Sequence, residues 1–146
     1  MLFLNVSYND ANQKRLIDGS VGTAPGLFER LKTGGNGFGG VFLEQIPPKL
    51  KEKFKGLNDR IKSIIEARKN GILIRFKIKT ETYAFVIPKS ELKNLVMKRI
   101  DVDLARLKVL TNGNSIDLLL RYHDARNLMK RLRKVPVLTD KVVWDL

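Results

Sequence analysis

The chain has 146 residues, a length that suits one domain with its own core, and its hydrophobic fraction of 43% and charged fraction of 29% are typical of globular proteins. It contains no cysteine and one histidine, His123, which excludes disulfides, thiolate nucleophiles and a histidine pair for a metal. Its 28 lysines and arginines outnumber 15 acidic residues, and the formal charge of +13 predicts a polyanionic partner, most commonly nucleic acid.

No apolar run approaches the roughly 18 to 20 residues that cross a bilayer, and the first residues lack the basic start of a leader peptide. We therefore expect a cytoplasmic protein without a membrane partner. The abundance of Lys and Ile, together with the lack of Cys, is also typical of thermophile proteins.

The N-terminal region, residues 1–46, is predicted to contain strands, short helices and a glycine-rich loop. Asn9 or Asp10 can cap a helix that runs to about Ile17, and Pro25 suits the first turn of another helix. Five glycines among residues 34–40 exclude a regular element there. The expected strands span residues 1–6 and 41–46.

Residues 48–69 have the pattern of a long amphipathic helix. A proline lies at the start, Asn70-Gly71 follows the end, and apolar side chains recur at intervals of four and three residues. The apolar stripe is either a core face or a seam between subunits of a homodimer. It consists of Leu50, Phe54, Leu57, Ile61 and Ile64.

Residues 72–134 resemble one unit repeated, with two alternating strands and then a helix. The first ββα unit spans 72–100, with Ser90 as helix cap, and the second spans 105–134, with Asp124 as cap. The units end in similar sequences, Asn94-Leu95-Val96-Met97-Lys98-Arg99 and Asn127-Leu128-Met129-Lys130-Arg131. Residues 135–146 form a tail or an edge strand.

The two hairpins have predicted registers. A turn at Thr80-Glu81 would pair Ile78 with Tyr83 and Phe76 with Phe85. Asn112-Gly113 suits a type I′ turn, which pairs Val109 with Ile116, Leu107 with Leu118 and Lys108 with Asp117. These elements predict a single α+β domain with an antiparallel sheet of four or more strands, a long amphipathic helix and the helices mainly on one face.

The uncovered face of that sheet is expected to be basic, with Asp117 as its only acid. Its cations are Arg75, Lys77, Lys79, Arg106 and Lys108. A grid of separated charges suits a phosphodiester backbone, although a solvated sheet face also carries Lys and Arg.

Two further groups extend this candidate surface. Lys130, Arg131, Arg133 and Lys134 lie near the end of the last predicted helix, where the helix dipole accounts for some of them. Phe38, in the glycine-rich loop, could stack on an unpaired base or could pack into the core.

The predicted function is non-catalytic binding of nucleic acid through its backbone, with single strands slightly favoured over duplex, DNA and RNA not distinguished, and no cofactor or metal. One alternative is a divalent-metal nuclease that uses Glu91, Asp101 and Asp103. Another is an assembly or structural protein of a mobile element or virus, which would associate through the 48–69 stripe.

Overall fold

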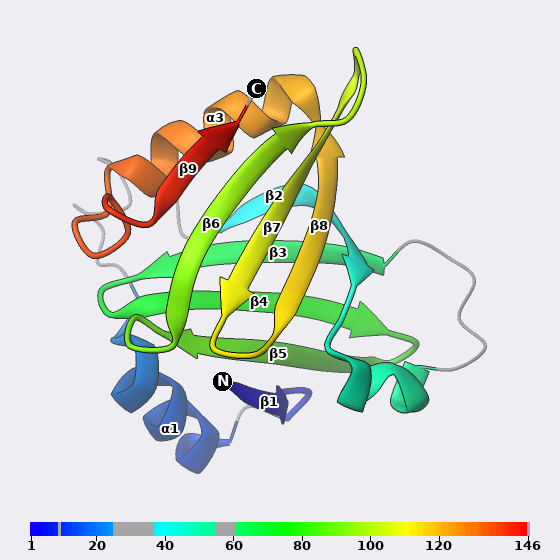
Figure 1. Cartoon of the computed structure of the whole chain (residues 1–146). Coiled ribbons are helices and arrows are strands. Elements are labelled where there is room, and N and C mark those ends of the chain that lie inside the picture. Colours follow the sequence, from blue (N-terminus) through cyan, green and yellow to red (C-terminus); the bar gives the residue numbers. More distant parts are fainter. Residues whose placement is uncertain (9, 25–36, 55–60, 146) are drawn as a thin grey trace.

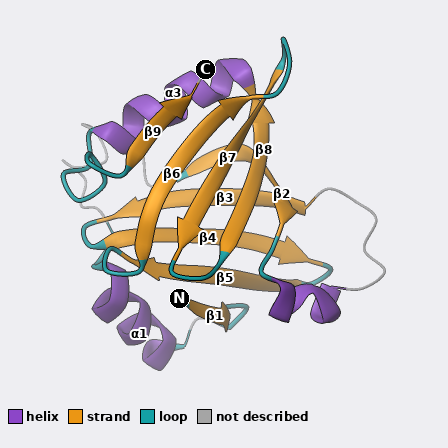
Figure 2. Cartoon of the chain, in the orientation of Figure 1, coloured by secondary structure: helices purple, strands orange, loops and turns teal. Residues whose placement is uncertain are grey.

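The computed structural model describes residues 1–8, 10–24, 37–54 and 61–145, without the side chains of 52–54 and 145. Strands make up most of it (Figure 2). The elements in chain order are β1 (Leu2–Asn5), α1 (Ala11–Val21), β2 (Phe38–Gln45), a 3₁₀ helix (Pro48–Phe54), β3 (Ile61–Arg68), β4 (Gly71–Ile78), β5 (Glu81–Pro88), β6 (Leu92–Arg99), β7 (Leu104–Thr111), β8 (Ser115–Arg121), α3 (Tyr122–Arg133) and β9 (Val142–Asp145).

The nine strands form one sheet in the order β1-β5-β4-β3-β2-β8-β7-β6-β9. All neighbours are antiparallel except β6 and β9, which are parallel. The sheet folds over itself, so the first half (β1, β5, β4, β3) and the second half (β8, β7, β6, β9) cross steeply, one in front of the other (Figure 1). The arrangement is that of two sheets packed face to face with crossed strands.

Strand β2 joins the two halves, and its sequence explains the bend. Its pairing shifts register against β3 between Phe38 and Val41, and against β8 between Leu43 and Gln45. Gly40 lies in the first of these irregularities with φ +78°, a conformation that favours glycine. Bulges bend and twist a strand, so the glycine pair at residues 39 and 40 allows the chain to turn from one half to the other.

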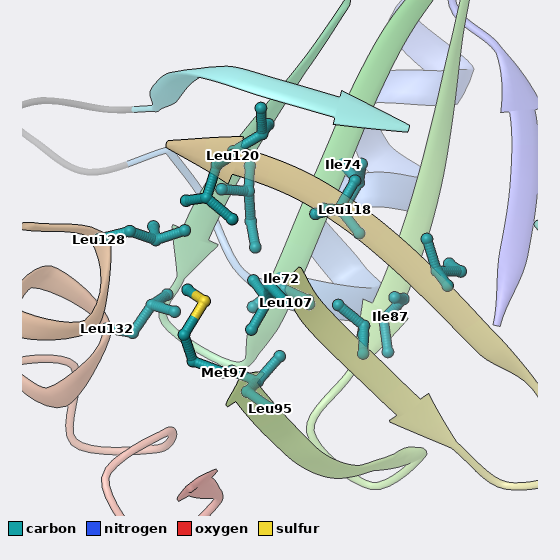
Figure 3. Close-up of a cluster of buried hydrophobic side chains, with 14 of the residues drawn as sticks. Ile72, Ile74, Ile87, Leu95, Met97, Leu107, Leu118, Leu120, Leu128 and Leu132 are labelled. Atoms are coloured by element: carbon teal, nitrogen blue, oxygen red, sulfur yellow. The ribbon is translucent and has the colours of Figure 1, made fainter. Parts of the chain in front are cut away.

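The main core fills the space between the two halves. Ile72 and Ile74 of β4 meet Leu107 and Leu118 of the second half, all fully buried. Helix α3 closes one side of this core with its apolar residues, and Leu128 and Leu132 point toward Met97 of β6 (Figure 3). A smaller cluster lies on the other face of the first half, where α1 packs on β4 and β5.

The fold prediction is therefore wrong in class, because a nine-stranded mixed sheet with short helices replaces the repeated ββα units and the long helix. The second unit alone has the predicted order of elements, as β7, β8 and α3. The 48–69 helix is replaced by the 3₁₀ helix and by β3, whereas residues 55–60 lie outside the described part. Ile61, Ser63 and Ile65 alternate toward the core, a period of two that the four-three stripe concealed. Asn70 belongs to the tight turn to β4, in which Arg68 pairs with Gly71. The proposed dimer seam is thus not formed as a helical stripe.

The helix of the first predicted unit is also wrong. Residues 92–99 form β6, held between β7 on one side and β9 on the other, although Asn127–Arg131, with nearly the same sequence, is helical. Leu95 and Met97 alternate into the core, whereas Leu128, Met129 and Leu132 follow the helical period. Neighbouring strands decide the conformation of such a segment, because tertiary pairing overrides local propensity. Ser90 therefore caps no helix.

The hairpins themselves are confirmed, one of them with a shifted register. The second has the predicted pairs, including Lys108 with Asp117, although only Gly113 of its turn has positive φ, so the turn is not type I′. In the first, the turn is Lys79-Thr80 and Phe76 pairs with Tyr83, two residues from the predicted partner. Lys79, the first residue of this turn, adopts φ +57°. The turn therefore begins one residue earlier in the chain than predicted.

The remaining local predictions concern the cap of α1, the C-terminal edge strand and the loop at residues 34–40. Asp10 caps α1 by accepting the N–H of Asn12 at 2.8 Å, as predicted. The edge strand near the C-terminus is confirmed as β9. The helix at Pro25 lies outside the described residues, and the predicted loop 34–40 is wrong for residues 38–40, which begin β2. Among the described helices, none has the length and apolar character of a membrane span.

Candidate functional site

The first-half cations of the predicted sheet surface lie on the face that points away from the core. Arg75 and Lys77 alternate with inward Ile74 and Phe76 and are exposed. Arg75 Nη1 lies 3.7 Å from an oxygen of Glu66, whose carboxylate is buried on β3. Lys79 is in the β4–β5 turn and not on the face of the sheet. The structure thus places two of these three cations on one face.

The second-half cations are bound to carboxylates. Arg106 donates Nε and Nη2 to the two oxygens of Glu44, both at 2.8 Å, and this hydrogen-bonded contact raises the pKa of Arg106. Lys108 Nζ lies 3.2 Å from Asp117 Oδ2, and Arg106 Nε lies 3.9 Å from the same atom. Ser115 Oγ lies 3.3 Å from the other oxygen of Asp117. The network joins β2, β7 and β8.

These positions change the character of the predicted surface. Because the two halves pack face to face, their outer surfaces point to different sides of the molecule, and the five cations do not form one plate (Figure 1). Glu44 and Glu66, which pair with Arg106 and Arg75, were not placed on the sheet by sequence reasoning. The segment that contains Glu44 was predicted as a strand, but no neighbouring strand was assigned to it. The segment that contains Glu66 was predicted as a helix.

The outer face of the first half also carries a buried ionic cluster. Arg68, 5% exposed, donates Nε to Glu66 Oε1 at 2.6 Å and Nη1 to the carbonyl oxygen of Gly22 at 3.0 Å. Nη1 also lies 3.4 Å from Asp18 of α1. A hollow of about 580 Å³ lies beside the cluster, and acids (Asp10, Asp18) as well as cations (Lys14, Arg68, Arg75) line it. Two of these cations, Arg68 and Arg75, already have carboxylate partners within the protein.

Helix α3 carries a different set of cations. Arg126, Lys130 and Arg133 follow one another at i, i+4 and i+7, so they form one exposed ridge along the helix, which we call the α3 ridge. In the described part of the chain, no carboxylate lies within ion-pair distance of these three side chains. Like charges at this spacing repel each other, so the contacts among the three cations do not stabilise the helix.

The opposite flank of α3 faces β2. Arg131 places its guanidinium carbon 5.1 Å from the centre of the Phe38 ring, and Phe38 packs against the core. Asp124, on the same flank of α3, lies near Gly40 of β2. It is an acidic residue in the first turn of α3 and not the predicted helix cap. Of the predicted α3 cations, Lys130 and Arg133 therefore lie on the ridge, Lys134 is the exposed C-cap residue, and Arg131 contacts Phe38.

A cleft of about 460 Å³ lies between α3 and the edge strand β9, along the α3 ridge. The two elements are neighbours at the side of the sheet (Figure 1). Among the described residues that line the cleft, none is acidic; they are Tyr122, Arg126, Met129, Lys130, Arg133 and Trp144. Sequence reasoning missed Arg126. The helical spacing of Tyr122, Arg126, Lys130 and Arg133 could have indicated the ridge.

The carboxylates of the nuclease alternative are not brought together. Glu91 precedes β6 and pairs with the N-terminal amine of Met1. Asp101 and Asp103 follow β6, so roughly 25 Å of strand separates them from Glu91. Asp101 accepts the N–H groups of Asp103 and Leu104 and closes the β6–β7 turn.

No group of three or more potential metal ligands of the His, Cys, Asp or Glu type occurs among the described residues. Comparison with protein-family models and with curated proteins finds no match for this chain.

Proposed function

We propose that the protein binds nucleic acid and that the α3 ridge contacts the phosphodiester backbone. One observation carries this proposal: three cations line one side of a helix without a carboxylate partner among the described residues. In nucleic-acid complexes, Arg and Lys side chains are among the groups that contact the phosphates, so the phosphates of a bound strand can neutralise such a row.

The composition supports a polyanion over a small anion. The formal charge is +13, and the positive potential of such a protein attracts extended anions over about one Debye length, roughly 8 Å at physiological salt. Successive turns of α3 present a charge about every 5.4 Å, so the ridge can follow a flexible charged chain. The helix dipole favours Lys130 and Arg133 in the last turn, but it gives no reason for Arg126 in the middle of the helix.

Fluorescence anisotropy with labelled single-stranded and duplex DNA and RNA, measured across a salt series, tests the proposal. In the ridge variant, Arg126, Lys130 and Arg133 are each changed to Gln. Each lost contact with a single strand removes about 0.7 from the log–log salt slope, so the variant should lose about 2 in slope and bind roughly 100-fold more weakly at about 0.1 M salt.

A matched variant removes the same charge from the first half of the sheet. Lys62→Gln, Lys77→Gln and Lys79→Asn change three exposed lysines, and Asn tolerates the positive φ at position 79. This variant should keep most of the affinity. Equal losses in both variants would show that net charge, and not the ridge, governs binding. Affinity for polyglutamate equal to that for nucleic acid would contradict nucleic acid as the ligand.

A further inference from the structure

The cleft between α3 and β9 combines aromatic rings with the cations of the α3 ridge. Tyr122 is the first residue of α3, and Trp144 lies on β9, where it pairs with inward-facing Met97 of β6. Both side chains are half-buried, pack against the main core and line the cleft. The cleft therefore has aromatic surface beside a row of positive charges.

The Tyr122 wall is held in place by the loop that precedes β7. The Arg99 guanidinium carbon lies 4.1 Å from the centre of the Tyr122 ring. Arg99 in turn donates Nε to the carbonyl oxygen of Asp101 at 2.9 Å and Nη2 to that of Val102 at 3.2 Å. The backbone N–H of Tyr122 donates to the Asp103 carbonyl oxygen at 2.8 Å. A ring fixed before binding loses little conformational freedom on binding.

The volume of the cleft suits a small planar group. About 460 Å³ lies within the roughly 300–1,000 Å³ of small-molecule sites, and buried Met129 contributes an apolar wall. A phosphate alone would contact the cations but would make no stacking contact with the rings. A base that carries its own phosphate uses both, because every base has a face that stacks on aromatic side chains and its phosphate can reach Arg126 or Lys130.

We infer, on the basis of the nucleic-acid binding proposed above, that the α3–β9 cleft is a stacking subsite for an unpaired base of a single strand. Bases within a duplex are paired and stacked on each other, so a ring inside a cleft reaches them only after they leave the stack. A free mononucleotide also combines a base with a phosphate. It lacks the neighbouring phosphates that a strand would offer to the rest of the α3 ridge.

Trp144 is the only tryptophan in the chain, so intrinsic fluorescence of the unlabelled full-length protein reports directly on this cleft. The probes are a short oligothymidylate, an abasic strand with the same number of phosphates, the thymidylate strand in a duplex, and thymidine monophosphate. Oligothymidylate should quench Trp144 emission. The abasic strand should bind with a similar salt slope, without quenching, and roughly 5- to 150-fold more weakly for one lost stacking contact.

A ring-removal variant with a matched control tests the other wall. Tyr122→Leu should weaken oligothymidylate binding at least about 5-fold and leave abasic-strand binding unchanged, whereas Tyr122→Phe keeps a ring and should bind as the wild type does. The wild-type comparison of the two strands does not depend on how these variants fold.

The outcomes separate the subsite from the general function. Equal binding of oligothymidylate and abasic strand, with unchanged emission, would overturn the stacking subsite and leave backbone binding in place. Failure of both strands to bind would overturn nucleic-acid binding itself. Duplex or mononucleotide binding as tight as that of oligothymidylate would overturn a single strand as the ligand.

Discussion

The outer face of the folded sheet and the α3 ridge are both rich in cations, but they differ in how those cations are partnered. On the sheet, Arg106 and Lys108 contact Glu44 and Asp117. On α3, no described carboxylate contacts Arg126, Lys130 or Arg133. The comparison shows that the position of acidic residues from distant strands, rather than the number of cations, distinguishes a structural ionic network from a surface open to a ligand.

The largest effect should come from the buried cluster on the sheet. Arg68→Gln leaves the buried Glu66 and the Asp18 carboxylate without their main cation, and we expect a loss of about 3–5 kcal/mol in the free energy of unfolding. Urea denaturation measures it. Lys69→Gln, at an exposed neighbouring position, serves as the control and should change stability by less than about 0.5 kcal/mol. Similar values for the two variants would contradict a structural role for the cluster.

The two sides of α3 should respond differently to mutation. Leu128 is 1% exposed and attaches the helix to the core, so Leu128→Ala should cost about 2–5 kcal/mol in unfolding free energy. The ridge variant, on the opposite side, should keep the melting temperature of the wild type while it loses affinity. A large drop in its melting temperature would show that the ridge cations stabilise the helix.

The β7–β8 network should behave as a structural contact with no effect on binding. Asp117, 3% exposed, holds Lys108 and lies near Arg106, and Asp117→Asn should cost about 1.5–3 kcal/mol in unfolding free energy. Although the variant gains positive charge on the sheet, its affinity for nucleic acid should change little. A gain comparable to the loss in the ridge variant would place binding on the sheet face instead.

The smallest effect concerns pH and the N-terminal end of the first half. Hydrogen bonds from Ser7 and from Asn5 lower the pKa of Glu81 below its ordinary value. The folded state thus binds this proton less readily than the unfolded state, so the contribution to stability is present above the unfolded pKa, about 4.3, and is lost as pH falls through the lower folded value.

Unfolding free energies of the wild type and of Glu81→Gln, measured in urea from neutral to acidic pH, test this assignment. The difference between the two proteins should be constant near neutrality and should shrink in acid. Ser7→Ala, which removes the first donor, should reduce the pH dependence. If the unfolding free energy of the wild type ran parallel to that of Glu81→Gln over the whole pH range, the lowered pKa of Glu81 would be contradicted.

Sequence patterns identified some of the elements that are closed by local turns. The two hairpins, the capped α1 and the helix after β8 are each determined by neighbouring residues in the chain. Strands β3 and β6 were missed because their apolar residues fit both a helical and an alternating period, and pairing with β2 and β4, or with β7 and β9, decides between them. The edge strand β9 could be predicted from the branched Val142 and Val143, but its parallel partner could not.

The candidate site was predictable to a similar extent. Lys130 and Arg133 stand out in a run of cations, and both lie on the α3 ridge. The cleft could not be predicted, since it depends on β9 folding back beside α3 after a connection of eight residues, 134–141. The partners of Arg106 and Arg75 come from strands whose order in the sheet is not visible in the sequence.

The most direct test of the account is a map of amide chemical shifts by nuclear magnetic resonance during titration with oligothymidylate. We expect the shifts to concentrate on α3 and β9, with Trp144 among the strongest, and the amides of β4 and β7 to stay unchanged. Shifts concentrated around Arg75, Lys77 and Lys108, with α3 and β9 unaffected, would contradict the assignment of binding to the α3 ridge.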